Sequence, residues 1–186
     1  MIISFNGDEG SGKSTIAKKV AAKLGYPRYY MGQIFRDIAA RRKLTLVEYL
    51  KLGETDPSVD KEVDDYLIDL SKKENDFVIE SRTAWYFVPQ SLKIYLQVDE
   101  KDGAQRIFNE LQKGNNRNEI KGEFSLEDIL EKIRERKNTD NARYMKYYQI
   151  NIREEKNYDF VLDTTKLTIE DVFKKTMEFI DSRNSL

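Results

Sequence analysis

The chain has 186 residues, of which 39% are hydrophobic and 35% are charged, and its formal net charge is −1. That length and composition fit one folded domain, and the balance of charges provides no global basic field for nucleic acid. The sequence contains neither cysteine nor histidine, which excludes disulfides, thiolate nucleophiles, Ser-His-Asp catalysis and most zinc sites. Any catalysis must therefore use carboxylates, lysine, arginine, hydroxyls or a bound hard cation.

The predicted elements alternate between strands and helices along the chain. Residues 1–6 are apolar and favour a strand, a glycine-rich stretch follows, and residues 13–25 show helical periodicity. Further strand candidates are 27–30, 76–81, 93–98 and 158–164, and further helix candidates are 31–43, 57–74, 101–113, 125–149 and 168–183. The segment 125–149 predicts one or two helices, and the polar residues 114–123 predict a mobile loop.

This alternation predicts an α/β fold with a parallel central sheet and helices on both faces. Residues 1–186 show no internal repeat or linker, so we expect a single domain. No apolar run approaches the about 20 residues of a membrane span, and no signal-peptide pattern opens the chain. We therefore expect a cytoplasmic protein, monomeric and without a stable nucleic-acid partner.

Residues 7–14 read GDEGSGKS and fit the pattern G-x-x-x-x-G-K-[ST] in full. In such a P-loop, glycines let backbone N–H groups approach phosphate oxygens, and the following helix points its positive end at the anion. Lys13 would contact the β- and γ-phosphates, and the Ser14 hydroxyl would bind Mg²⁺. The motif predicts binding of ATP by Gly7, Asp8, Glu9, Gly10, Ser11, Gly12, Lys13, Ser14 and Thr15.

A phosphate acceptor needs its own site, and the first candidate follows the apolar residues 76–79. Ligands of parallel sheets lie at the carboxyl ends of the strands, which places Glu80 and Arg82 near the phosphates. Glu80 could hold a water molecule of the Mg²⁺ ion, and Arg82 could bind an acceptor phosphate bidentately. The alternative is an exposed ion pair at the end of a strand.

A second candidate is formed by Arg136, Asp140 and Arg143, whose spacing places them on one helix face. Two arginines beside a carboxylate can bind phosphates and a sugar or base, or they can form a solvated ion-pair ladder. Arg36 could also reach an acceptor phosphate, whereas the cluster 41–43 after it favours compensation of a helix dipole.

These motifs resemble those of the cytidylate kinases, P-loop enzymes that transfer the γ-phosphate of ATP to CMP or dCMP. The similar stretches cover nearly the whole chain: GDEGSGKSTIAKKVAAKLG, MGQIFRDIA, IESR, LQKG, LEKIRERKNTDNARY and VLDTTKLTIEDV. The resemblance implies a core of about 1–30, 75–112 and 157–186, a monophosphate-binding region of about 31–74 and a lid of about 113–156.

The resemblance also implies roles for individual residues. ATP phosphates and Mg²⁺ would be bound by Lys13 and Ser14, the monophosphate by Arg36 and Arg82, its sugar, base or phosphate by Asp140 and Arg143, and the transferring group by Arg106 and Arg136. Because an acceptor phosphate oxygen is already a nucleophile, alignment and charge neutralisation suffice and no general base is needed. Closure over the substrates would exclude water and suppress ATP hydrolysis.

Three positions depart from the family pattern. Ser81 stands in place of the usual glycine, Gln33 in place of an acidic residue, and Gly103 where many members have another lid arginine. The polar insert 113–123 adds Lys113, Arg117 and Lys121; these could replace the missing charge, but a solvated extension is the favoured interpretation.

Two other functions stay open from the sequence. A kinase of the same fold could use UMP, AMP or a small non-nucleotide such as shikimate as its acceptor. Alternatively, the chain could be an assembly or RNA-associated factor that uses ATP as a switch with weak hydrolysis. Such a switch protein has no need of the converging groups Arg82, Arg136, Asp140 and Arg143.

Overall fold

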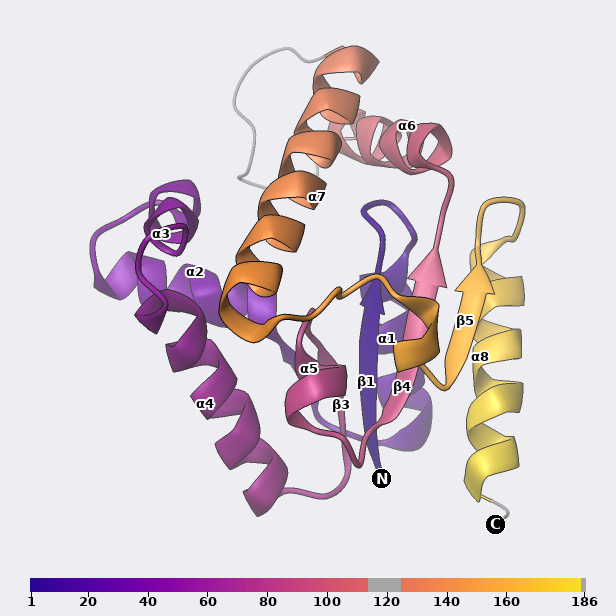
Figure 1. The fold of residues 1–186 in the computed structure, drawn as a ribbon. Helices are drawn as coiled ribbons and strands as arrows, with labels where there is room; N and C mark the ends of the chain where they lie inside the picture. Colours follow the sequence, from indigo (N-terminus) through magenta and orange to yellow (C-terminus); the bar gives the residue numbers. More distant parts are fainter. Residues whose placement is uncertain (114–124, 185–186) are drawn as a thin grey trace.

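The computed structural model of the protein describes residues 1–113 and 125–184. Five strands form one parallel sheet in the order β2-β3-β1-β4-β5 (Figure 1). They are β1 (Ile2–Gly7), β2 (Arg28–Tyr30), β3 (Phe77–Glu80), β4 (Leu92–Gln97) and β5 (Phe160–Asp163). The predicted parallel α/β fold is confirmed. Since all strands run the same way, their carboxyl ends meet at one edge of the sheet.

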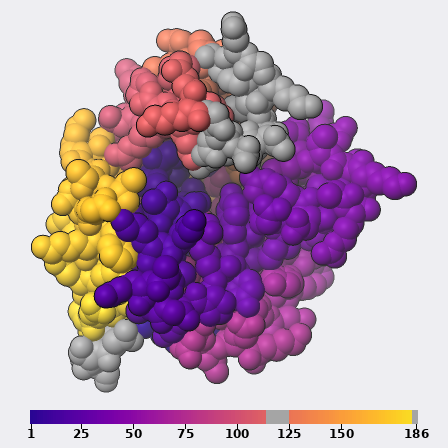
Figure 2. Space-filling view, turned by 180° about the vertical axis from the view of Figure 1, so that it is seen from behind, coloured from indigo at the N-terminus to yellow at the C-terminus, as the bar shows by residue number. Residues whose placement is uncertain are grey.

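Helices follow the strands and cover both faces of the sheet. They are α1 (Lys13–Leu24), α2 (Met31–Arg41), α3 (Leu46–Leu52), α4 (Ser58–Lys73), α5 (Ala84–Phe87), α6 (Glu100–Gln112), α7 (Leu126–Tyr148) and α8 (Ile169–Asn184), with a 3-10 turn at Glu155–Asn157. The back view shows α8 in yellow and the α2–α4 segment in purple on opposite sides of the indigo N-terminal segment (Figure 2). None of these helices, within the described ranges, is long and apolar enough to cross a membrane.

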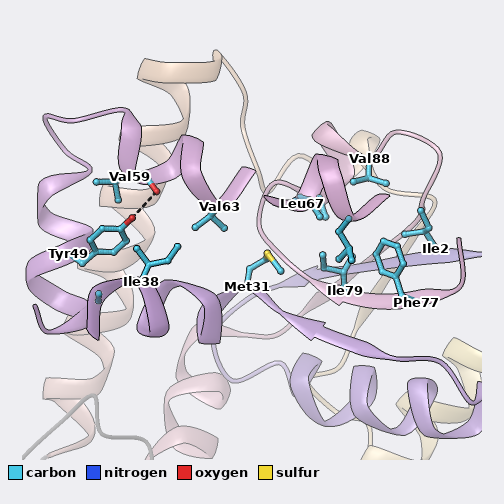
Figure 3. Packing of buried hydrophobic residues seen from close by; sticks show 13 residues of the cluster. Ile2, Met31, Ile38, Tyr49, Val59, Val63, Leu67, Phe77, Ile79 and Val88 are labelled. Atoms are coloured by element: carbon cyan, nitrogen blue, oxygen red, sulfur yellow. Dashed lines mark hydrogen bonds between the residues drawn. The ribbon is translucent and has the colours of Figure 1, made fainter. Parts of the chain in front are cut away.

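Alternation along the strands produces two hydrophobic cores. Ile2, Phe77 and Ile79 face the segment that includes Met31, Val63 and Leu67 of α2 and α4 (Figure 3). The intervening strand residues pack on the other face, against α1 and α8. Both faces of each central strand are therefore buried, as expected for a parallel sheet that helices cover on both sides.

The long segment predicted as one or two helices is a single helix, α7. It begins with the expected capping box, in which Ser125 and Asp128 satisfy each other's backbone N–H groups. Its N-terminal half packs on α6 through a cluster with Ile129 and Ile133, and from there it crosses toward α4 and α5 (Figure 1). The predicted loop 114–123 lies outside the described residues. The division into core, monophosphate-binding region and lid stays a prediction.

Candidate active site

A cavity of about 720 Å³ opens at the carboxyl edge of the sheet, between the glycine loop, α2, α4 and α7. All predicted site residues except Gly7 and Asp8 line it: Glu9, Gly10, Ser11, Gly12, Lys13, Ser14, Thr15, Arg36, Glu80, Arg82, Arg106, Arg136, Asp140 and Arg143. The structure thus brings the two halves of the predicted site into one space. A cavity of this size can hold both a phosphate chain and a second ligand.

The glycine loop wraps over the start of α1. Asp8 faces away from the cavity: its carboxylate accepts hydrogen bonds from the Tyr95 hydroxyl (2.8 Å) and the Val98 N–H (3.2 Å). Lys13 lies across the loop and donates to the Asp8 carbonyl oxygen (3.3 Å). Loss of hydration lowers the pKa of Lys13 to about 8, although the neighbouring Glu9 carboxylate opposes this effect. This partly dehydrated ammonium group beside the cavity is suited to an anionic ligand.

Gly103, one of the departures from the family pattern, packs directly on the glycine loop. A Cβ added there would lie 2.5 Å from the Glu9 carbonyl oxygen, and one at Gly10 would collide with the Gly103 backbone. The absence of a side chain at Gly103 is therefore required by the close approach of α6 to the loop.

We expect Gly103→Ala to raise the KM for ATP about tenfold, because overpacking against backbone costs about 1–3 kcal/mol and must displace the loop. The measurement is the ATP dependence of ADP formation. Gln105→Ala, an exposed change on the same helix, is the matched control. An unchanged KM for ATP would show that the glycine loop accommodates the added methyl group without losing affinity for ATP.

Ser14 and Glu80 meet at the base of the glycine loop. The Ser14 hydroxyl donates to a Glu80 carboxylate oxygen (2.6 Å), and the Arg28 guanidinium pairs with the other oxygen. Hydroxyl and carboxylate oxygens are hard donors that suit Mg²⁺, which usually takes few protein ligands together with nucleotide phosphates. In the described parts of the chain no group of three or more acidic residues could hold a metal ion on its own. The hydroxyl and carboxylate oxygens of Ser14 and Glu80 fit a Mg²⁺ ion that nucleotide phosphates also bind.

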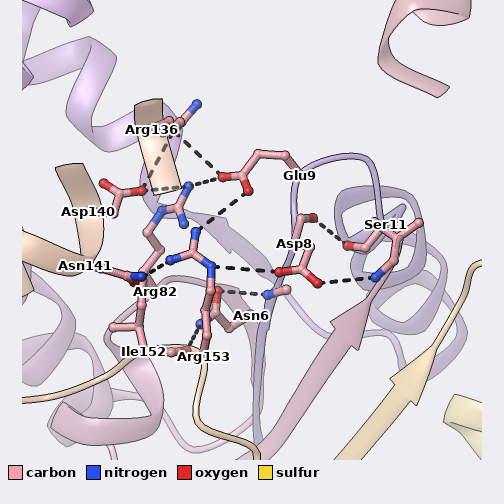
Figure 4. Close-up of polar contacts among 12 residues, drawn as sticks. Asn6, Asp8, Glu9, Ser11, Arg82, Arg136, Asp140, Asn141, Ile152 and Arg153 are labelled. Atoms are coloured by element: carbon pink, nitrogen blue, oxygen red, sulfur yellow. Dashed lines mark hydrogen bonds and ion pairs between the residues drawn. The ribbon is translucent and has the colours of Figure 1, made fainter. Parts of the chain in front are cut away.

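Beyond the loop, Arg82 joins two carboxylates across the cavity. Its guanidinium donates to Glu9 (2.6 Å) and lies 3.1 Å from Asp140 (Figure 4). Burial alone would raise the pKa of Glu9, but the charges of Arg82 and Lys13 outweigh it and hold that pKa well below its usual range. The ionised Glu9 carboxylate thus balances the charges of Arg82 and Lys13, which are also suited to bind anionic phosphates.

Arg153 is a site neighbour that sequence reasoning missed. From the segment after α7 its guanidinium donates to Asn141 (2.6 Å) and lies 3.8 Å from both Asp8 and Glu9 (Figure 4). Its Nη2 is buried and has no hydrogen-bond partner among the residues that the structure describes. No local motif marks this residue, because the chain segment that carries it reaches the glycine loop only through the fold.

Asp140 and Arg143 form the next contact on α7. Arg143 lies 3.3 Å from Asp140, as the one-face spacing predicted, and its Nε lies 3.1 Å from Asp60 of α4. All three side chains are buried, at 2–6% exposure. A solvated ion-pair ladder, the alternative for this face, is therefore wrong for Asp140 and Arg143. Arg136 is half-exposed and lies 4.0 Å from both Glu9 and Asp140.

The remaining predicted arginines lie at the rim of the cavity. Arg36 lies over the Tyr30 ring, 5.6 Å from its centroid. Arg106 donates to the carbonyl oxygens of Gly10 (3.3 Å), Thr164 (2.7 Å) and Thr165 (3.0 Å), and so ties the glycine loop to the end of β5. The predicted contact of Arg106 with a transferring group stays a prediction.

The other two departures from the family pattern have local partners. Ser81 accepts a hydrogen bond from the Thr83 N–H (3.1 Å) and shapes the turn after β3. Gln33 is exposed and donates to Asp37 one turn later on α2 (2.9 Å). Ser81 therefore belongs to the cavity wall, whereas Gln33 does not line the cavity.

Comparison with known proteins identifies the family. The model of the cytidylate kinase-like family matches residues 2–166. The chain belongs to this family. A cytidylate kinase of Pyrobaculum aerophilum is 34% identical over 181 residues, covering 96% of this chain and 92% of that protein. A cytidylate kinase of Methanocella arvoryzae is 32% identical, with 97% of each chain covered. The protein is accordingly an ATP-dependent phosphotransferase of the nucleoside monophosphate kinase group.

Solved structures support the fold. A shikimate kinase from Bacteroides thetaiotaomicron has a TM-score of 0.65 at 13% identity, covering 100% of this chain and 99% of that one. An uncharacterised protein from Eubacterium ventriosum has a TM-score of 0.72 at 16% identity, covering 98% and 99%. At these identities the likeness shows a shared P-loop kinase fold and carries no information on the acceptor.

Proposed function

We propose that this kinase transfers the γ-phosphate of Mg-ATP to CMP or dCMP, giving ADP and CDP or dCDP. The observation that carries the proposal is one continuous cavity that joins the glycine loop to the buried arginine–carboxylate groups after β3 and on α7. A nucleotide-switch protein has no need of such a second site. The acceptor is inferred from the cytidylate kinases that the chain matches at 31–34% identity.

In the proposed mechanism the residues align two phosphate groups and neutralise their charge. Lys13 and the backbone N–H groups of the loop would hold the β- and γ-phosphates, and Ser14 with Glu80 would hold the Mg²⁺ ion. Mg²⁺, when bound, offsets negative charge on the phosphates of ATP. Arg82 and Arg36 would hold the acceptor phosphate, whose oxygen attacks the γ-phosphorus as the bond to the ADP oxygen breaks. No side chain needs to remove a proton.

The test is ADP formation from Mg-ATP with CMP, dCMP, UMP, dTMP, AMP or GMP, each offered separately, and with no acceptor. Strong stimulation by CMP or dCMP supports the proposal. Stimulation by another monophosphate alone would keep the kinase mechanism and overturn the acceptor. Slow hydrolysis that no monophosphate stimulates would favour the switch protein. The same panel with and without EDTA tests the need for Mg²⁺.

The acceptor side can be tested through Arg143. We expect Arg143→Ala to raise the KM for CMP about tenfold or more and to change the KM for ATP less than about threefold, because a charged hydrogen-bond donor is lost on one side only. Arg134→Ala on the same helix removes an exposed arginine that pairs with Glu100 (2.7 Å), and is the matched control. If the rate and the KM for CMP stay unchanged, Arg143 does not belong to the acceptor site.

A further inference from the structure

The two oxygens of the Glu9 carboxylate face different arginines. Oε1 accepts a hydrogen bond from Arg82 (2.6 Å) and lies 4.0 Å from the Nε of Arg136, and both of these arginines line the cavity. Oε2 lies 3.8 Å from the Nη2 of Arg153, which is buried and does not line the cavity (Figure 4). Glu9 therefore stands between arginines that substrates can contact and one that is set back from them.

The guanidinium of Arg153 is held in place and keeps one donor unused. Its Nη1 donates to Asn141 of α7 (2.6 Å). The preceding residue, Ile152, is fully buried, and its carbonyl oxygen accepts a hydrogen bond from Asn6 of β1 (3.0 Å). Within the described ranges Nη2 has no hydrogen-bond acceptor, because the 3.8 Å to Glu9 exceeds the about 3.2 Å of a hydrogen bond. Since an unsatisfied buried donor costs free energy, a short move that joins it to Glu9 is favourable.

The other carboxylate near Arg153 already has its own donors. Asp8 lies 3.8 Å from the Nε of Arg153. Its two oxygens accept hydrogen bonds from the Tyr95 hydroxyl (2.8 Å) and the Val98 N–H (3.2 Å). Asp8 therefore stays where it is without Arg153, and Glu9 is the carboxylate that the unused donor can serve.

Substrate phosphates compete with Glu9 for the same cations. Although burial opposes ionisation, the charges of Arg82 and Lys13 hold the pKa of Glu9 well below its usual range, so this carboxylate is charged. In the proposed function Lys13 contacts the β- and γ-phosphates and Arg82 contacts the acceptor phosphate. Phosphates bound there place negative charge beside the Glu9 carboxylate, and like charges repel strongly in a partly buried site. Glu9 then needs another counter-charge, or it weakens phosphate binding.

We propose that Arg153 is a positioning residue that becomes the hydrogen-bond partner of Glu9 when substrate phosphates bind to Arg82. Its Nη2 donates to Oε2 and so balances the negative charge that Arg82 and Lys13 release as they turn to the phosphates. Arg153 itself contacts neither substrate and acts through Glu9. The inference rests on the proposed binding of phosphates by Lys13 and Arg82, and it does not depend on the base of the acceptor.

The first test compares the Kd of Mg-ATP with that of Mg-ADP in the wild type and in Arg153→Met, by calorimetry. Methionine keeps an aliphatic stem and removes the guanidinium. Because only ATP carries the γ-phosphate, a Glu9 carboxylate without its second partner should weaken ATP binding more than ADP binding. We expect the Kd of Mg-ATP to rise about tenfold and that of Mg-ADP less than about threefold. An equal loss for both ligands, or no loss for ATP, would overturn the inference.

A matched control lies in the same segment of the chain. Lys156 is an exposed cation that pairs with Glu154 (2.8 Å), so Lys156→Ala should bind both nucleotides like the wild type. Arg153→Lys keeps the charge but cannot reproduce the fork that serves Asn141 and Glu9 together. We expect it to recover part of the loss, leaving the Kd of Mg-ATP about threefold above that of the wild type.

A change at Glu9 tests whether Arg153 acts through this carboxylate. In the Glu9→Gln background there is no negative charge for Arg153 to balance. Arg153→Met should therefore raise the Kd of Mg-ATP less than about threefold in that background, compared with about tenfold in the wild type. The same tenfold loss in both backgrounds would show that Arg153 supports the loop independently of Glu9, and the proposal would be wrong.

A third measurement needs no variant. In a structure of the wild type with CMP and the imido analogue of Mg-ATP, Nη2 of Arg153 and Oε2 of Glu9 should lie about 2.7–2.9 Å apart. A Glu9 that still accepts its hydrogen bond from Arg82 beside bound phosphates would refute the proposal, even if the Arg153 variants failed to fold. Failure of CMP to bind or to accept phosphate would refute the proposed acceptor, whereas the nucleotide affinities decide on Arg153 without any acceptor.

Discussion

Lys13→Ala should lower kcat about a thousandfold at saturating ATP and acceptor, because it removes the positive charge that we propose to contact the transferring phosphoryl group. The half-buried ammonium donates to the Asp8 carbonyl oxygen (3.3 Å), and the Glu9 carboxylate favours its charged form. Lys18→Ala, an exposed change one turn later on α1, is the control. Both variants should unfold at temperatures close to that of the wild type. A Lys13→Ala enzyme with more than a tenth of wild-type kcat would remove Lys13 from the catalytic group.

The pH dependence of the wild type follows from the same residue. Loss of hydration lowers the pKa of Lys13 to about 8, and only the protonated amine can bind phosphate oxygens. Because kcat/KM reports the free enzyme, its value for ATP should be constant below pH 8 and should fall toward tenfold per pH unit above it. Lys13→Ala should lose this descending limb. A wild-type profile that stays flat to pH 10 would contradict the assignment.

The elements and contacts formed by residues close together in the chain could be predicted, because short sequence patterns specify them. The strand, glycine loop and helix at residues 1–25 follow one another as the motif requires. The spacing of Asp140 and Arg143 predicted that they share a helix face, and they are in contact. Helix α3 was missed, although Thr45 and Glu48 form a capping box at its start. At seven residues it is too short for periodicity to reveal it, and only the cap could have marked it.

The long-range parts of the site could not be predicted in the same way. Asp60 stands on α4 beside Val59 and Val63, and sequence alone shows it as one of many acids on an amphipathic helix. Arg28 contacts Glu80 because β2 lies beside β3 in the sheet. Arg153 contacts the glycine loop because the segment after α7 passes beside it. Contacts of this kind join residues far apart in the sequence, so they can be identified only once the arrangement of the strands and helices is known.

A change at Arg82 should have an effect as large as that of Lys13→Ala, because Arg82 links the glycine loop to α7 through Glu9 and Asp140 and is the proposed ligand of the acceptor phosphate. Arg82→Ala should lower kcat/KM for CMP about a thousandfold. It would remove the proposed ligand of the acceptor phosphate, and it leaves Glu9 and Asp140 without the nearer of their two shared counter-charges, Arg136 being the other. Arg82→Lys keeps the charge without the fork geometry, so a loss of about a hundredfold is expected. Equal activity of the alanine and wild-type enzymes would remove Arg82 from the site.

A second change at Glu9 can separate two causes of the Arg82→Ala defect: the loss of the phosphate ligand and the loss of the counter-charge for Glu9. If part of the Arg82→Ala defect comes from an unpaired carboxylate that repels incoming phosphates, then adding Glu9→Gln should restore about tenfold of the lost kcat/KM. Restoration would show that Glu9 holds the arginine cluster in place of the phosphates until substrates arrive. Additive losses in the double variant would instead mean that Glu9 itself supports the bound phosphates, since two residues with independent favourable roles do not compensate each other. The double-mutant cycle thus decides between two roles of Glu9: it pairs with the arginines only until phosphates bind, or it supports the bound phosphates.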